Sequence, residues 1–135
     1  GPARRGADVL AVQGRWAMSL DLYLHEGWCD HCKRFGPQLW RMNITHNLVK
    51  MATAANVYEV CWRSFGPPGD KPVVTAAQAL PTVSAGIQWL DENEAIALQF
   101  EPPNGWGSYQ GLRDFLREFE RACIENPTAV LRSCG

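Results

Sequence analysis

The sequence lacks a long apolar run and an excess of either charge. No stretch of about 18 apolar residues occurs and no signal-peptide pattern is visible, so we expect no membrane association. Thirteen lysine and arginine residues are balanced by fourteen aspartate and glutamate residues, which leaves a net charge of −1. Domains that bind nucleic acid usually carry a basic face, so this balance argues against a nucleic-acid partner.

Several signatures of enzymes and of secreted proteins are also missing. The sequence has no paired carboxylates, no Ser-His-Asp order and no glycine-rich phosphate loop, which favours a non-enzymatic role while leaving an enzyme open. Its five cysteines are an odd number, which does not suit a complete disulfide framework. Reduced thiols are typical of the cytoplasm, where we therefore expect the protein.

What is present fits one compact domain. The chain has 135 residues, 46% of them hydrophobic, and six tryptophans, which is enough to build a core. Gly1-Pro2 matches the residues that a tag-cleaving protease leaves behind, and Met18 begins a segment that resembles a natural start. We expect residues 1–17 to be a tag remnant or disordered extension and residues 18–135 to form a single globular domain.

The hydrophobic pattern predicts an α+β fold that is mainly helical. Residues 20–24 and 129–133 alternate as strands do, and we expect them to pair. Residues 43–55, 75–90 and 112–123 repeat apolar side chains at helical spacing, the second after a Thr75–Gln78 capping box. The prediction is three principal helices packed on a small antiparallel sheet of two strands, one N-terminal and one C-terminal.

The motif with the clearest chemistry is Trp28-Cys29-Asp30-His31-Cys32-Lys33. It resembles the thioredoxin active site in the tryptophan, the lysine and Pro37 five residues beyond Cys32. Such a protein would use Cys29 as the nucleophile and Cys32 as the resolving thiol. The segment Leu80-Pro81-Thr82 could then imitate the cis-proline that faces the pair, although the helical pattern after Pro37 argues against that fold.

Two other interpretations of the pair remain open. Two cysteines at this spacing are half of a tetrahedral zinc site, which would need two further ligands. The candidates for these are His25, His31, His46 and Cys61. Alternatively, Cys29 and Cys32 are reduced thiols in a turn, with no cofactor at all.

A second candidate site is a polar segment at an expected helix start. Asn43, Thr45, His46 and Asn47 gather there, and free N–H groups at a helix start suit a small anionic ligand. Trp106 and Tyr109 could add a stacking wall. The structural alternative is that asparagine and threonine simply cap the helix while the histidine bonds the backbone.

Seven segments in order resemble a group of small proteins encoded in bacteriophage and prophage genomes. They are Asn43-Ile-Thr-His-Asn-Leu48, Met51-Ala52, residues 55–62, Thr75-Ala-Ala-Gln78, Gly86-Ile87, Asn104-Gly-Trp-Gly-Ser-Tyr109 and Ala122-Cys-Ile-Glu-Asn-Pro127. The resemblance implies a phage-related protein in the host cytoplasm, and it transfers no catalytic residue. The Cys29–Cys32 loop and Cys61 are not typical of the group.

These observations lead to three functional hypotheses. The first is a phage-related accessory protein that binds a host protein or a small ligand through the polar segment, Trp106 and Tyr109. The second is a thiol–disulfide oxidoreductase that uses Cys29 and Cys32. The third is a zinc-stabilised module. The sequence leaves the oligomeric state undetermined.

Overall fold

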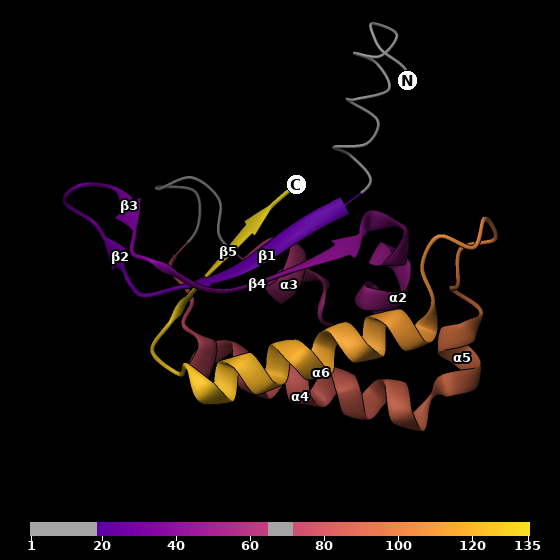
Figure 1. The fold of residues 1–135 in the computed structure, drawn as a ribbon. Coiled ribbons are helices and arrows are strands. Elements are labelled where there is room, and N and C mark those ends of the chain that lie inside the picture. Colours follow the sequence, from indigo (N-terminus) through magenta and orange to yellow (C-terminus); the bar gives the residue numbers. More distant parts are fainter. Residues whose placement is uncertain (1–18, 65–71) are drawn as a thin grey trace, which may run out of the picture.

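A computed structural model describes residues 19–64 and 72–135 of the chain. The expected tag remnant or extension at residues 1–17 lies outside the described residues, as do residues 65–71. The described part combines an antiparallel sheet with helices that cover one of its faces (Figure 1). The predicted α+β class is confirmed. Among the described residues, no helix is both long enough and apolar enough to cross a membrane.

The main sheet has three strands in the order β4-β1-β5, all antiparallel. The central strand β1 (Ser19–His25) lies between β4 (Gln38–Thr45) and β5 (Val130–Cys134). The buried leucines of β1 (Leu20, Leu22 and Leu24) face the helices, because successive side chains of a strand point to opposite faces. The predicted pairing of the N- and C-terminal strands is confirmed, but the prediction of two strands was wrong, since β4 adds a third.

The helices form the second layer. Two of them, α4 (Ala76–Glu92) and α6 (Tyr109–Glu125), are long and pack side by side (Figure 1). A Ser84–Glu120 hydrogen bond and an Arg113–Asp91 ion pair link the two. The shorter elements are η1 (His46–Leu48), α2 (Val49–Ala54), α3 (Tyr58–Trp62) and α5 (Glu94–Leu98).

Local signals explain where the long helices begin. The Thr75 side chain accepts the Gln78 N–H while the Gln78 side chain accepts the Thr75 N–H, which is the predicted capping box. The Ser108 hydroxyl accepts the Gly111 N–H at the start of α6. The whole predicted stripe of α6 is buried, namely Leu112, Phe115, Leu116, Phe119 and Cys123.

The third predicted helix, over residues 43–55, was wrong in its first part. Asn43 and Ile44 belong to β4, where they pair with Asp21 and Leu20 of β1. The chain then passes through the 3-10 turn η1 before the short helix α2. Ile44 fits both the helical spacing and the alternation of a strand, and its pairing with β1 decides for the strand.

A narrow hairpin extends from the end of β1 and the start of β4. It contains β2 (Trp28–Cys29) and β3 (Arg34–Phe35), which pair with each other as a separate two-stranded sheet. Gly27 permits the bend between β1 and β2, because its φ of 83° lies in the left-handed region. Figure 1 shows this hairpin projecting away from the helices, on the side opposite α2 and α5. Residues 28–35 are called the hairpin tip below.

Candidate functional site

The hairpin tip presents the cysteine pair in a tight turn. Cys29 pairs with Arg34 at the last rung, so the four residues from Asp30 to Lys33 make the turn. The Cys32 N–H donates to the Cys29 Sγ at 3.3 Å. Both cysteines are free and exposed. The turn therefore points two neighbouring sulfur atoms at solvent and already supplies one N–H···S hydrogen bond.

Two more features fix the turn. Lys33 has a φ of 55°, the left-handed conformation that reverses the chain direction at the end of such a loop. Its Nζ pairs with Asp30 Oδ1 at 3.0 Å, although both side chains are largely exposed and the ion pair contributes little to stability. A shallow hollow of about 380 Å³ lies beside the two sulfur atoms, with Trp28 and Phe35 among its walls.

The two thiols differ in acidity. The hydrogen bonds that Cys32 donates, first from its thiol and then from its backbone N–H, lower the pKa of Cys29. Because Cys32 is the donor in that contact, its own pKa is raised. Cys29 is therefore the sulfur that ionises first.

His25 and Arg132 tie the base of the hairpin to the sheet. His25 Nδ1 lies 2.8 Å from the Gly36 carbonyl oxygen, to which it must donate. Its other ring nitrogen, Nε2, accepts from Arg132 Nε at 3.2 Å. Both ring nitrogens are thus engaged inside the protein, and only 7% of the residue is exposed.

Aromatic rings extend this support into the tip. The Arg132 guanidinium lies 4.1 Å from the centre of the Tyr23 ring and 5.6 Å from that of Phe35. Phe35 also packs against His25 and, edge-on, against Trp28, with ring centres 4.8 and 4.9 Å apart. Sequence reasoning missed Arg132 and Phe35, because nothing local indicates that they meet.

The structure does not assemble the predicted metal set of Cys29, Cys32, His25 and His46. Both nitrogens of His25 are occupied within the protein. His46 follows the end of β4 that pairs with Ser19, at the opposite end of the sheet from the tip. Within the described ranges, no group of three or more His, Cys, Asp or Glu side chains could hold a metal ion.

The remaining cysteines lie elsewhere. Cys61 of α3, a predicted alternative ligand, is buried in the core, and burial raises its pKa. Cys123 is also buried, as predicted, with its pKa raised to about 12. Cys134 is exposed on β5 opposite Asp21, several rungs from the tip. None of these thiols lies beside the pair.

The polar segment is engaged inside the protein. Thr45 caps η1 by accepting the Asn47 N–H at 3.2 Å. This agrees with the structural alternative, in which threonine has a capping role. Asn43 caps nothing, because in β4 its amide donates to Leu20 O and Asp21 Oδ1. Asn47 Nδ2 donates to Trp106 O at 3.2 Å and so pins the loop before α6. Asn43, Thr45 and Asn47 therefore each make hydrogen bonds within the protein.

The two predicted stacking residues have different surroundings. Trp106 is 61% exposed in the loop that Asn47 holds. Tyr109 is buried at the first turn of α6, and its hydroxyl donates to Leu90 O at 2.7 Å. Tyr109 therefore joins α4 to α6 and is not part of a ligand wall, so the predicted pair does not form one surface.

His46 contacts an indole. Trp62 Nε1–H donates to His46 Nδ1 at 2.8 Å, so that nitrogen must be unprotonated, and burial lowers the pKa of His46 below 6.5. Below pH 6.5 the unfolded chain thus binds the proton more readily than the folded protein does. The contribution of His46 to stability is complete above pH 6.5 and is lost as the pH falls towards its lowered pKa.

We therefore expect the melting temperature to fall between pH 7.5 and 5.5, by less in His46→Gln than in the unmodified protein. Glutamine can accept the Trp62 bond at both pH values but does not titrate. Over the same range, the NMR resonance of the Trp62 indole N–H should shift only in the parent protein. Equal pH dependence in the two proteins would contradict this role of His46.

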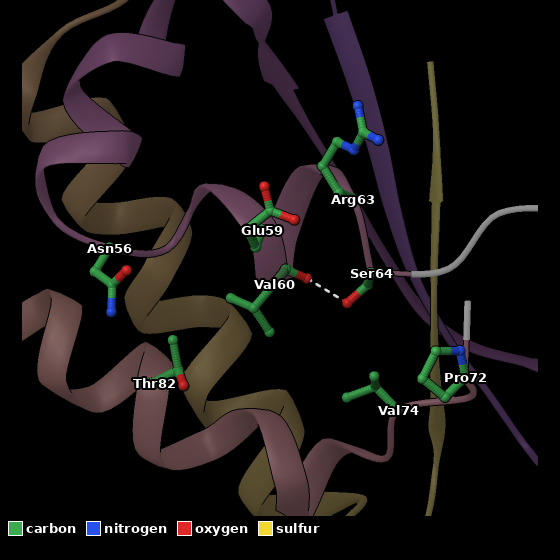
Figure 2. Close-up of a pocket in the computed structure, with 8 residues that line it drawn as sticks. All are labelled: Asn56, Glu59, Val60, Arg63, Ser64, Pro72, Val74 and Thr82. Carbon is green, nitrogen blue, oxygen red and sulfur yellow. Dashed lines mark hydrogen bonds between the residues drawn. The ribbon is translucent and has the colours of Figure 1, made fainter. Parts of the chain in front are cut away.

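A larger hollow of about 410 Å³ lies between α3 and the start of α4. Figure 2 shows Val60, Val74 and Thr82 pointing towards one another across it. Ser64 Oγ donates to Val60 O, which engages the hydroxyl in the backbone. Among the described residues that line this hollow there is no imidazole or thiol, and Glu59 is its one carboxylate.

Comparisons with known proteins found no match among protein families, curated proteins or solved structures.

Proposed function

We propose that the protein is a non-enzymatic accessory module that binds a soft divalent metal ion, zinc above all, through Cys29 and Cys32. The observation that carries the proposal is the turn in which the Cys32 N–H donates to the Cys29 Sγ at 3.3 Å. Thiolates are the ligands that zinc prefers in structural sites, and hydrogen bonds to the ligating atoms orient and tune them. Both sulfur atoms are exposed, so an ion can reach them without opening the fold.

The support behind the tip fits a binding role. The His25, Arg132 and Phe35 contacts attach the hairpin firmly to the sheet, so the turn is presented at a fixed place. A metal site on a supported hairpin loses less conformational entropy on binding than one on a free tail. The phage-related origin remains part of the proposal and is supported by the ordered set of segments from Asn43 to Pro127.

The test is metal binding by the reduced, metal-free protein. We expect cobalt, used as a spectroscopic substitute for zinc, to give thiolate charge-transfer absorption, and zinc to displace it. Cys29→Ser and Cys32→Ser should each lower the zinc affinity at least about 100-fold, because even changes behind a ligand cost 10–100-fold. Cys134→Ser is the matched control, since it removes an exposed thiol far from the tip.

Unchanged zinc affinity in both tip variants would overturn the proposal, as would no binding by the parent protein. A loss in Cys134→Ser equal to that in the tip variants would show that the thiols bind without a defined site.

Thiol–disulfide exchange is the second candidate, because the contact from Cys32 to Cys29 also suits a nucleophile beside its resolving thiol. The Cys29 thiolate would attack a substrate disulfide and expel one thiolate. Cys32 would then displace the second, leaving a Cys29–Cys32 disulfide that dithiothreitol must reduce again. The thioredoxin-like surroundings are not there: the pair lies in a β-turn, Pro81 is inside α4, and the described residues contain no cis peptide. Insulin reduction that disappears in Cys29→Ser would favour this candidate.

A further inference from the structure

The hairpin tip supplies fewer ligands than a structural zinc site needs. Structural zinc sites are almost always four-coordinate and tetrahedral. The tip supplies two thiols, Cys29 and Cys32. The sequence contains five cysteines and three histidines, none of them in residues 1–18 or 65–71, so the position of every such side chain is known.

None of the other thiols or imidazoles completes the site. Cys61 and Cys123 are in the core, and Cys134 lies on β5 opposite Asp21. His25 has both nitrogens occupied, and His46 bonds to Trp62 at the far end of the sheet. His31 lies within the turn, between the two cysteines, but among the described residues no third His, Cys, Asp or Glu side chain joins the pair in a group that could hold a metal ion. One chain therefore offers half of a tetrahedral site.

The shape of the molecule allows a second chain to supply the other half. The tip projects beyond the helical layer, so two tips can meet while the two domains stay apart (Figure 1). The exposed sulfur atoms lie at the outer end of the projection. A pair of identical tips related by a two-fold axis would bring together four thiolates, because such an axis repeats the same surface on both copies.

The charges of the tip favour this arrangement only when the metal is present. Asp30, Lys33 and Arg34 give each tip one net positive charge, so two tips repel each other without an ion. A zinc ion with four thiolates carries two negative charges, which balances the two tips. Metal binding and association should therefore be coupled.

We propose that one zinc ion is shared by two copies of this chain, each contributing Cys29 and Cys32, at the junction of two hairpin tips. This inference rests on the proposed function. It names the partner, a second copy of the chain, and the stoichiometry, one ion for two chains. Association here requires zinc and reduced thiols, and it involves no exchange of electrons.

The experiment measures stoichiometry and mass together. Reduced, metal-free protein is titrated with cobalt and separately with zinc, and the products are analysed by native mass spectrometry and sedimentation velocity. We expect the absorption to saturate at half an equivalent of cobalt per chain and the zinc complex to be a dimer containing one ion. Chelator should return the protein to the monomer, and at the same concentrations Cys29→Ser and Cys32→Ser should remain monomeric.

Different failures separate the two proposals. A monomer with one zinc ion would overturn the shared site while leaving the proposed function intact, and loss of that ion in His31→Ala would identify the third ligand. A dimer that forms without metal, or that persists in chelator, would also overturn the inference. No zinc binding at all would overturn both. Cys134→Ser should dimerise like the parent protein.

Discussion

Replacing Phe119 with alanine is expected to lower the free energy of unfolding by about 3–5 kcal/mol. Phe119 is fully buried on α6, where its ring stacks on Trp40 of β4 with centres 5.5 Å apart. It also contacts Phe115, so it connects the helical layer to the sheet. Its removal loses the apolar transfer energy of the ring and leaves a cavity that the two rigid layers cannot close.

The loss is large beside the total stability of roughly 5–15 kcal/mol that is usual for such domains. Urea denaturation should show a lower midpoint at an unchanged slope, and the melting temperature should fall by roughly 10–20 °C. Ile124→Ala is the matched control, because Ile124 lies on the same helix but is 60% exposed, and its change should stay within about 0.5 kcal/mol. Similar losses in the two variants would contradict this account of the core.

Gly36→Ala is expected to disrupt the base of the hairpin. A Cβ at Gly36 would overlap the carbonyl group of Glu26. Because that carbonyl group is backbone, no side-chain rotation relieves the collision. Two hydrogen bonds flank this place, from Glu26 N–H to Pro37 O at 2.8 Å and from Gly36 N–H to Gly27 O at 3.0 Å. We expect a cost of about 1–3 kcal/mol or more, as for other overpacked sites.

Amide hydrogen exchange locates the damage. Protection should fall at Glu26 and Gly36, and the bond from His25 to Gly36 O should be lost with it. Gly27→Ala is the control, because its φ of 83° makes alanine strained there while nothing lies within 4 Å of the added carbon. Equal loss of protection in the two variants would contradict the role given to the contact with Glu26, because Gly36, unlike Gly27, has no positive φ to strain.

Much of the fold follows from local signals. The alternation of β1, the capping box of α4 and the apolar stripe of α6 are each complete within a short segment, and each is confirmed. Strand β4 was missed, although Trp40, Met42 and Ile44 alternate with polar residues along it. Ile44 lies four residues before Leu48, and this helical spacing competes with the alternation until pairing with Leu20 decides between them.

The cysteine pair of the candidate site was predictable from the sequence, but the contacts that support it were not. Cys29 and Cys32 stand out in the sequence because their spacing is characteristic of thiol chemistry. The contacts that position them join residues far apart in the sequence, such as Arg132 and His25, and a local pattern of apolar residues cannot predict such contacts. The polar segment differs: Thr45 and Asn47 have the composition of a ligand site, and in the structure their hydrogen bonds cap η1 and hold the Trp106 loop.

The order of strands in the sheet also constrains how the protein is made. Strand β1 finds β4 through a nearby hairpin, which can close in about 1–10 μs, but its other neighbour arrives late, since His25 and Arg132 are 107 residues apart. During synthesis, the edge of β1 that pairs with β5 therefore stays open until residues beyond 130 have left the ribosome. Unpaired apolar strands of this kind are prone to self-association, so a newly made chain is most vulnerable to aggregation, and most accessible to chaperones, in that interval.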